Sequence, residues 1–402
     1  MLETLRSVLR FRRPTLSAAG RRLATAADVG DLRRLARRRL PGGVFDYIDG
    51  AAEDEITLER NRAAFHRLEF RPRVLRGVAE VDTTTRLLGR STPLPLVLAP
   101  TGFTRMADPD GELAVARAAA RAGVPYCLST LSTRSIEEVA AASDSVAWGG
   151  EGERRLWFQV YVWRDRGLVA DMIRRAADAG YEALVLTVDT PVLGRRERDV
   201  RRGFTLPPEI GLDTLLDGAR HPGWTWRFVR SEPIRFANVV GASVGDGSDA
   251  VSLSAYINSQ FDRSLSWADV DWLRRHWDGP VVLKGIQCVD DAVRAAEAGV
   301  DAVALSNHGG RQLDGAPPPL ELVEPVVDAV GDRLEVICDG GIRRGADLAR
   351  VVALGARAGM AGRAYLYGLG AAGEAGVDHV LALFDTGLRR TLALLGVTEL
   401  AE

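Results

Sequence analysis

The stretch SNHGGRQLDGAPPP, residues 306–319, holds side chains that could carry out proton chemistry on an anion. His308 and Arg311 stand three positions apart, directly after the apolar run AVALSN (302–307). An imidazole accepts protons near neutral pH, and a guanidinium binds a carboxylate through two parallel hydrogen bonds. Glycines between the two residues allow a bend that turns both side chains toward one ligand. The stretch predicts a general base beside a carboxylate site, with a purely structural histidine as the alternative.

A second polar group follows the apolar run ALVLTVD (183–189), in the segment LTVDTPVLGRRERD. It supplies Asp189, which could stabilise a protonated imidazole, and Arg196, a second candidate carboxylate ligand. Two further motifs, DGGIRRG (339–345) and AGRAY (361–365), combine glycines with arginines. Glycines let backbone N–H groups approach an anion closely and arginines add charge, so these motifs predict a phosphate site.

The chain has a single lysine, Lys284, although lysine and arginine together number 52. It lies at the end of the apolar run PVVLKG (280–285), where a surface lysine would be unusual. A site that keeps lysine in so arginine-rich a chain is expected to need a compact ammonium group rather than the planar guanidinium group of arginine. Chance survival of one surface lysine is the alternative.

The elements that must position these groups alternate regularly after residue 90. Continuously apolar runs, typical of strands buried on both faces, alternate with helical stretches, several of which end in a glycine suited to a left-handed cap. Eight such units predict an α/β fold, the (β/α)8 TIM barrel, with a doubly wound open sheet as the runner-up. The predicted strands are 94–100, 125–130, 156–161, 183–189, 280–285, 302–307, 334–340 and 358–363.

The carboxyl ends of barrel strands build the active site, so the residues at those ends are the candidates. Polar groups follow nearly every predicted strand, which favours the barrel over the open sheet. The candidates are Pro100, Thr101, Gly102, Ser129, Gln159, Tyr161, Thr187, Asp189, Arg196, Lys284, His308, Arg311, Asp339, Gly340, Gly341, Arg343, Gly362 and Arg363.

Some parts of the chain fall outside the repeat. Residues 1–25 form a basic arm with six arginines against one acidic residue, and residues 26–90 form a helical segment. Residues 203–266 form a long excursion between the fourth and fifth strands, a length typical of lids and interaction surfaces. We expect one domain over residues 26–400, preceded by the arm and carrying the excursion as an inserted lid or surface loop.

Composition narrows the classes of function. Hydrophobic residues make up 46% of the chain and charged residues 26%, as in globular proteins, and the net charge of −2 gives no reason to expect nucleic acid. The sequence contains no run of 18 or more apolar residues, so it predicts no membrane-spanning helix. The three cysteines are not spaced for zinc, and we interpret them as reduced and mostly buried in a cytoplasmic protein without a metal site.

The motifs SNHGGRQLDG, LTVDTPVLGRRERD, DGGIRRGADL and FDYIDGAAEDE resemble those of the FMN-dependent L-2-hydroxy acid dehydrogenases and oxidases. The likeness covers residues ~25–398 and is strongest in the histidine-containing stretch. That family includes glycolate oxidase, lactate oxidase, mandelate dehydrogenase and the bacterial respiratory L-lactate dehydrogenases. PTGFTR and GRAYLYGL are most similar to the respiratory L-lactate dehydrogenases.

The resemblance implies FMN as cofactor and gives each candidate a role. The catalytic group would be His308 as base, Asp189 as its partner and Tyr161 near the hydroxyl. The substrate would be bound by Tyr47, Tyr161, Arg196 and Arg311, with Leu131 and Leu193 forming an apolar pocket that suits the methyl group of lactate. FMN would contact Pro100, Thr101, Gly102, Ser129, Gln159, Thr187, Lys284, Ser306, Asp339, Gly340, Gly341, Arg343, Gly362 and Arg363.

The expected reaction is oxidation of an L-2-hydroxy acid, L-lactate to pyruvate in the first place, with electrons passed to a quinone, a cytochrome or another non-oxygen acceptor. The alternatives are an oxygen-using oxidase or monooxygenase acting on glycolate, mandelate or a longer substrate, another FMN barrel such as an isomerase or nucleotide dehydrogenase, and a non-catalytic flavin-binding protein.

The basic arm and the tryptophans of the excursion, Trp224 and Trp226, suggest peripheral contact with the inner face of the cell membrane. A solvated loop with a few packed aromatic side chains is the equal alternative. We also expect a homo-oligomer, with a tetramer favoured.

Overall fold

The computed structural model describes residues 17–203, 211–239 and 259–402, and within them eight parallel strands close into a barrel. The strand order is β10-β3-β4-β5-β6-β7-β8-β9, so every strand pairs with its neighbour along the chain and the last pairs with the first. This confirms the predicted (β/α)8 barrel and excludes the open sheet. The strands are β3 (Leu96–Leu98), β4 (Tyr126–Ser129), β5 (Leu156–Val160), β6 (Ala183–Thr187), β7 (Val281–Ile286), β8 (Ala302–Ser306), β9 (Glu335–Asp339) and β10 (Ala358–Ala361).

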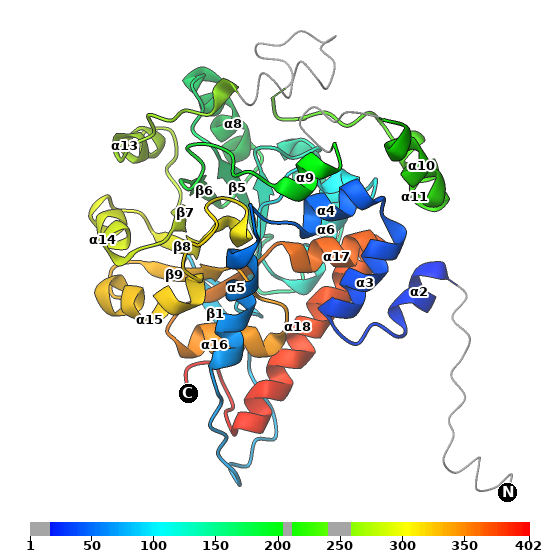
Figure 1. The fold of residues 1–402 in the computed structure, drawn as a ribbon. Coiled ribbons are helices and arrows are strands. Elements are labelled where there is room, and N and C mark those ends of the chain that lie inside the picture. The colour runs from blue at the N-terminus through cyan, green and yellow to red at the C-terminus, as the bar shows by residue number, and fades with distance from the viewer. Residues whose placement is uncertain (1–16, 204–210, 240–258) are drawn as a thin grey trace, which may run out of the picture.

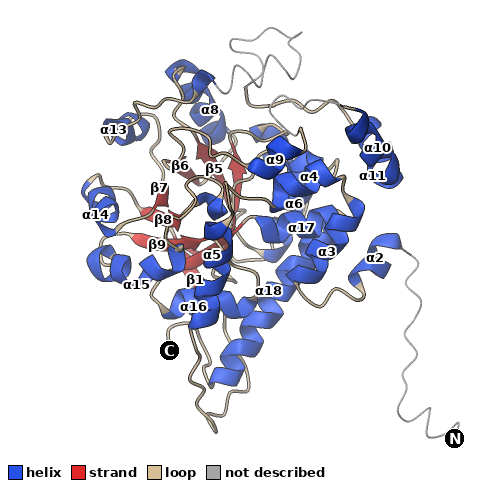
Figure 2. Cartoon of the chain, viewed as in Figure 1, coloured by secondary structure: helices blue, strands red, loops and turns tan. Residues whose placement is uncertain are grey.

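Helices surround the strands on the outside of the barrel (Figures 1 and 2). Strands such as β5 and β6 are buried at every position, which explains why their sequences are continuously apolar. Gly123 and Gly180 adopt φ of +68° and +72° where helices turn into strands, as the glycine pattern predicted. The helices of the barrel are α6 (Gly111–Ala122), α7 (Ile136–Asp144), α8 (Arg166–Asp178), α13 (Ala268–Arg274), α14 (Val289–Glu297), α15 (Pro319–Val330), α16 (Gly345–Ala353), α17 (Arg363–Ala372) and α18 (Glu374–Leu395), with short 3-10 turns at Thr104–Met106 and His308–Gly310.

The N-terminal segment packs against the barrel rather than standing apart. Its helices are α2 (Ala18–Leu23), α3 (Val29–Arg39), α4 (Gly42–Asp49) and α5 (Ile56–Arg67). The predicted basic arm lies mostly outside the described residues, but its end is fixed, because Arg22 Nε donates to the Ala371 carbonyl of α17 at 2.8 Å.

A hairpin of β1 (Thr85–Leu87) and β2 (Arg90–Thr92) was not anticipated, since residues 26–90 were expected to be helical. Leu87 is fully buried, and its carbonyl accepts a hydrogen bond of 2.6 Å from Arg155, whose side chain is 1% exposed. Arg155 precedes β5, so the hairpin covers the amino-terminal end of the barrel, opposite the end where the candidate residues gather.

The short helix α9 (Glu197–Arg201) precedes the excursion, which contains α10 (Leu212–Arg220) and α11 (Pro222–Val229) at the outer edge of the molecule in Figure 1. The predicted lid at 203–266 falls partly outside the described residues. No helix in the described part of the chain is long and apolar enough to cross a membrane. Of the three free cysteines, Cys127 and Cys338 are buried in strands and Cys288 is exposed.

Candidate active site

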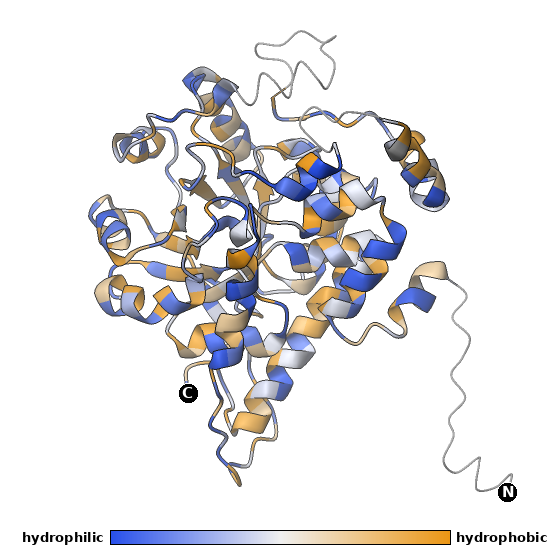
Figure 3. Ribbon diagram, in the orientation of Figure 1, coloured by the Kyte–Doolittle hydropathy of each residue, from blue (hydrophilic) through white to orange (hydrophobic). Residues whose placement is uncertain are grey.

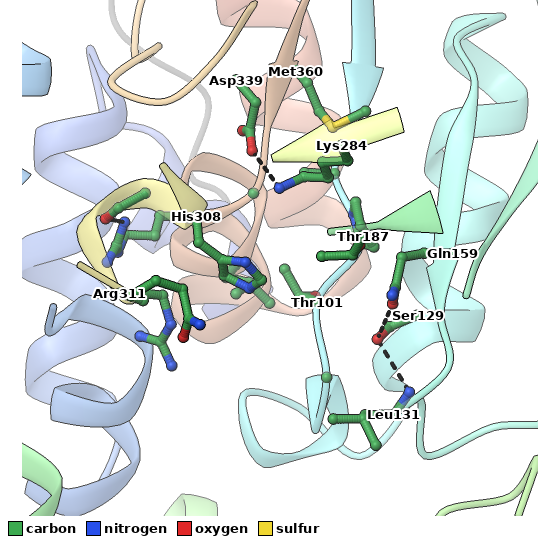
Figure 4. Close-up of a pocket in the computed structure, with 18 of the residues that line it drawn as sticks. Thr101, Ser129, Leu131, Gln159, Thr187, Lys284, His308, Arg311, Asp339 and Met360 are labelled. Carbon is green, nitrogen blue, oxygen red and sulfur yellow. Dashed lines mark hydrogen bonds and ion pairs between the residues drawn. The ribbon is translucent and has the colours of Figure 1, made fainter. Parts of the chain in front are cut away.

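A cavity opens at the carboxyl ends of the barrel strands, where the sequence placed the candidates (Figure 4). It is lined by all of the predicted site residues except Asp189 and Ser306, which lie behind the wall and bond to residues that line it. The lining residues among the candidates are Tyr47, Pro100, Thr101, Gly102, Ser129, Leu131, Gln159, Tyr161, Thr187, Leu193, Arg196, Lys284, His308, Arg311, Asp339, Gly340, Gly341, Arg343, Gly362 and Arg363.

Lys284 is 3% exposed, and it forms a closed charge cluster with residues of the next two strands. Its ammonium donates to Ser306 Oγ at 2.9 Å and lies 2.8 Å from Asp339 Oδ2, and Ser306 Oγ donates to the same carboxylate oxygen at 2.7 Å. Burial alone would lower the pKa of Lys284, but the charges of Asp339 and Asp189 raise it above its ordinary value. The single lysine is therefore a buried, fully charged group at the cavity, which contradicts the reading of a chance surface lysine.

Gln159 carries a donor that the protein leaves unused. Its Oε1 accepts from Ser129 Oγ at 3.1 Å and from the Thr130 backbone N–H at 3.3 Å. Its Nε2 is buried and has no hydrogen-bond partner among the described residues. A buried unsatisfied N–H group costs free energy, so its place on the cavity wall points to an acceptor oxygen or nitrogen on a bound molecule.

His308 is held in a left-handed backbone conformation, with φ of +56°, which is unfavourable for a residue with a Cβ atom. Its Nδ1 lies 3.0 Å from Asp189 Oδ1 and 3.2 Å from Oδ2. Burial alone would raise the pKa of Asp189, but the charge and hydrogen bond of His308, followed by Lys284, hold it below its ordinary value. An ionised Asp189 can only accept, so Nδ1 carries a proton and Nε2 of a neutral ring is free to take one.

The loop that carries His308 is fastened to α5 by side-chain amides. Asn61 and Asn307 exchange two hydrogen bonds of 2.8 Å, each donating to the carbonyl oxygen of the other. Asp314, farther along the same loop, accepts from the backbone N–H of Thr57 at 2.8 Å. These contacts offset the strained conformation of His308, because they fix the loop on both sides of it.

The predicted carboxylate ligands converge around one tyrosine. The guanidinium carbons of Arg311 and Arg196 lie 5.1 and 5.4 Å from the centre of the Tyr47 ring. Arg311 donates to the backbone carbonyls of Tyr47 and Gly50 at 2.8 and 3.0 Å. Burial, followed by the charge of Arg196, lowers the pKa of Arg311 to about 9, so this corner of the cavity favours an anion.

The arginine of the AGRAY motif has contacts that the sequence did not indicate. Arg363 donates to the backbone carbonyls of Ile48, Gly309 and Gly50, at 3.0, 2.8 and 2.6 Å, and so joins α4 to the His308 loop. It lines the cavity at the beginning of α17, beside Gly362. A helix N-terminus attracts anions, so the predicted phosphate site is compatible with this end of the cavity, although Arg363 already has three acceptors.

Among the lining residues that the sequence did not indicate are three aromatic ones, Phe103, Phe236 and Phe261, of which the last two belong to the excursion. Phe103 directly follows the candidate Gly102, but Phe236 and Phe261 lie far from any strand end, so no strand-end rule could have found them. The cavity as a whole fits FMN on this chain's own features: an unpaired amide donor on one wall, a buried ammonium on another, and a glycine-bordered helix N-terminus at one end.

Comparison with known proteins gives one family for nearly the whole chain. The profile of the FMN-dependent dehydrogenase family matches residues 36–402. An L-lactate dehydrogenase of Caulobacter vibrioides is 45% identical over 372 residues, which are 92% of this chain and 94% of that protein. An L-lactate oxidase of Nostoc sp. is 41% identical, covering 94% and 97% of the two chains. The crystal structure of the monotopic membrane protein (S)-mandelate dehydrogenase superimposes with a TM-score of 0.87 at 40% identity, covering 94% and 97%.

Proposed function

Because the chain belongs to the FMN-dependent dehydrogenase family, we propose that it oxidises L-2-hydroxy acids and that its substrate is L-lactate, which it converts to pyruvate. FMN is its cofactor, and when bound it supplies the two-electron acceptor at the reacting carbon. The observation that carries the proposal is the convergence of His308, Arg311 and Arg196 on one cavity.

The arginines account for recognition of the substrate. Arg311 and Arg196 would hold its carboxylate, since a carboxylate supplies the negative counter-charge that favours the charged form of the buried Arg311 guanidinium. Tyr47 lies under both guanidinium groups, and Tyr161 lines the same cavity next to the Asp189 charge. Burial, followed by that charge, raises the pKa of Tyr161, so its hydroxyl stays protonated and can donate to the substrate oxygen.

His308 accounts for the removal of a proton. Oxidation of a 2-hydroxy acid releases two electrons and two protons, and Nε2 of His308 would take one proton, from C2 or from the hydroxyl. Asp189 then stabilises the imidazolium through the 3.0 Å contact at Nδ1. General bases of this kind contribute about 10²–10⁴-fold to a rate.

The experiment is a visible spectrum of the purified holoenzyme before and after anaerobic addition of L-lactate. We expect the flavin band to bleach and to return faster with a water-soluble quinone than with air, as for a dehydrogenase. Faster return with air would instead favour the oxygen-using alternative, for which the Nostoc relative is the precedent. A flavin that stays oxidised with every L-2-hydroxy acid would contradict the proposal.

We also propose that the protein associates with the surface of a membrane through α10 and α11. Leu212, Leu215, Leu216, Trp226 and Val229 on these helices are all more than half exposed, and Figure 3 shows hydrophobic residues along both helices. Exposed apolar residues gathered in this way favour an interface over free solvent. Trp224, which was expected to join them, instead stacks on Phe228 and donates to the Met106 carbonyl at 2.8 Å.

Flotation with anionic lipid vesicles tests this second proposal. We expect Leu215→Asp combined with Leu216→Asp to lose vesicle binding, while Leu394→Asp, at a position 71% exposed on α18, keeps it. Deleting residues 1–25 should weaken binding without slowing flavin reduction by L-lactate. Equal flotation of the wild type and the α10 double variant would contradict the proposed association.

A further inference from the structure

The outer side of the cavity is formed by aromatic rings rather than by strand ends. Phe236 and Phe261 line the cavity, and they are only 4% and 9% exposed. Phe103, in the loop after β3, follows the lining residues Thr101 and Gly102 in the chain and packs on Phe236. The wall is therefore apolar, whereas the corner around Tyr47 carries the guanidinium groups of Arg311 and Arg196.

These rings pack directly on the two tyrosines of the polar corner. The ring centres of Tyr47 and Phe103 are 6.0 Å apart, and those of Phe103 and Phe236 are 4.6 Å apart. On the other side, the ring centres of Tyr161 and Phe261 are 5.3 Å apart. A molecule whose carboxylate rests on the arginines around Tyr47 would therefore lie close to these rings.

Phe236 is held in place from both sides by hydrogen bonds to the barrel. Arg105 donates to the Glu232 carbonyl at 2.6 Å, and Asn238 Nδ2 donates to Ser132 Oγ at 2.8 Å. Asn238 Oδ1 also accepts from the Ile136 backbone N–H at 2.9 Å. The ring is thus fixed by the loops after β3 and β4, the same loops that border the cavity.

Phe261 is anchored in a similar way to the loop after β5. Arg164 N–H donates to the Gln260 carbonyl at 3.0 Å, and Asp165 N–H donates to Gln260 Oε1 at 3.1 Å. Phe261 itself forms an isolated antiparallel bridge with Trp163. Both rings are therefore parts of a built wall, and their positions do not depend on neighbouring exposed side chains.

We propose that Phe236 and Phe261 determine which substituent on C2 of the substrate is accepted, and that they select apolar substituents and limit their size. The inference rests on the proposed function and names the substrate class of that site. Each methylene that fits an apolar pocket is worth roughly 10–200-fold in kcat/KM, while a hydroxylated or charged substituent would lose its hydration without gaining a partner. Glycolate, which has only hydrogen there, would leave the wall uncovered.

The test compares anaerobic flavin reduction by L-lactate and by (S)-mandelate in matched variants. We expect Phe236→Ala and Phe261→Ala to raise the ratio of kcat/KM for (S)-mandelate over L-lactate by roughly tenfold or more, because removing a ring makes room for a larger substituent. Phe236→Leu should shift the ratio in the same direction by less. Phe228→Ala is the control, because Phe228 belongs to the same excursion but stacks on Trp224 outside the cavity.

A binding measurement gives a readout that does not depend on turnover. Perturbation of the flavin spectrum reports the Kd of oxalate, which has only a carboxylate oxygen where the substrate has its C2 substituent, and of phenylglyoxylate, which has a phenyl group there. Phe236→Ala should leave the Kd of oxalate within twofold of the wild type and tighten phenylglyoxylate binding severalfold. If L-lactate reduces the flavin of the wild type and of the variants but the substrate ratio is the same in all of them, this inference alone is overturned. If no 2-hydroxy acid reduces the flavin of the wild type, the proposed function is contradicted.

Discussion

Two charged clusters meet at the same end of the barrel, and they differ in how their charges are balanced. In one cluster, the Lys284 ammonium, the Ser306 hydroxyl and the Asp339 carboxylate bond to one another at N–O and O–O distances of 2.7–2.9 Å. The positive and negative charges of this cluster therefore cancel without any ligand. In the other cluster, Arg196 is paired with Asp199 at 2.8 Å, but Arg311 has only two backbone carbonyls as acceptors and no carboxylate within ion-pair distance in the described part of the chain. The contrast indicates that the first cluster is a permanent part of the fold and that the second is completed by an anionic substrate.

The largest expected effect comes from the proposed base, His308, which lines the same cavity as Arg311. His308→Gln should slow anaerobic flavin reduction by L-lactate by about 10²–10⁴-fold, because a glutamine amide cannot accept the proton. Stopped-flow absorbance measures the rate directly. His276→Gln, at an exposed histidine bonded to the Trp272 carbonyl on the outside of the barrel, should react at the wild-type rate. A His308→Gln enzyme that is reduced within tenfold of that rate would remove His308 from the role of base.

In the complete cluster, removing one charge should damage the fold itself. Lys284→Met leaves Asp339 buried without its counter-charge, and breaking a buried pair in this way costs roughly 3–5 kcal/mol. Urea unfolding of the FMN-free protein would show the loss. The double variant Lys284→Met with Asp339→Asn should recover part of it, since the unpaired charge is gone. Equal stability of the wild type and Lys284→Met would mean that the cluster is not the permanent part of the fold described above.

A substitution that keeps the positive charge of Arg311 but changes its shape tests the role of its guanidinium group as a carboxylate ligand. Arg311→Lys should lower kcat/KM for L-lactate by about 100-fold, which corresponds to roughly 2–3 kcal/mol, because an ammonium cannot form two parallel hydrogen bonds. Arg201→Lys serves as the control, since Arg201 lies on the exposed side of α9 with a side chain 68% exposed. A loss shared equally by the two variants would show that Arg311 has no special role in binding.

The smallest effect concerns the dependence of stability on pH. The pKa of Asp189 is lower in the folded protein than in the unfolded chain, so its contribution to stability is present above about pH 4 and is lost as the pH falls through the folded value. The difference in unfolding free energy between the wild type and Asp189→Asn should therefore be larger at pH 6 than at pH 3. Urea unfolding at both values measures it, and a difference that grows toward pH 3 would reverse the assigned direction.

The sequence was sufficient to predict the barrel and most of the cavity because these depend on local periodicity. Continuously apolar runs end at or near Lys284, Asp339 and Gln159. A closed parallel barrel brings the carboxyl ends of its strands together independently of the loop sequences. The single lysine of an arginine-rich chain indicated that Lys284 belongs to the site, whereas its pairing with Asp339 was seen only in the structure.

The remaining features depend on contacts between distant loops, which no local pattern records. Phe236 reaches the cavity because Asn238 bonds to the loop after β4, more than a hundred residues earlier in the chain. Arg363 is tied to the carbonyls of Ile48 and Gly50 because α4 packs over the beginning of α17. The β1–β2 hairpin was missed because its turn is Leu88-Gly89, with a leucine at φ of +50° where an asparagine or glycine would have given a clear signal.

The most direct test of the account is a crystal structure of the FMN-loaded protein with oxalate, which carries the carboxylate of the substrate but cannot be oxidised by the same route. We predict one oxalate carboxylate within hydrogen-bond distance of the guanidinium groups of both Arg311 and Arg196, with His308 Nε2 facing the same molecule. Oxalate bound elsewhere, or a cavity in which the two guanidinium groups point to different ligands, would contradict the claim that an anionic substrate completes this cluster.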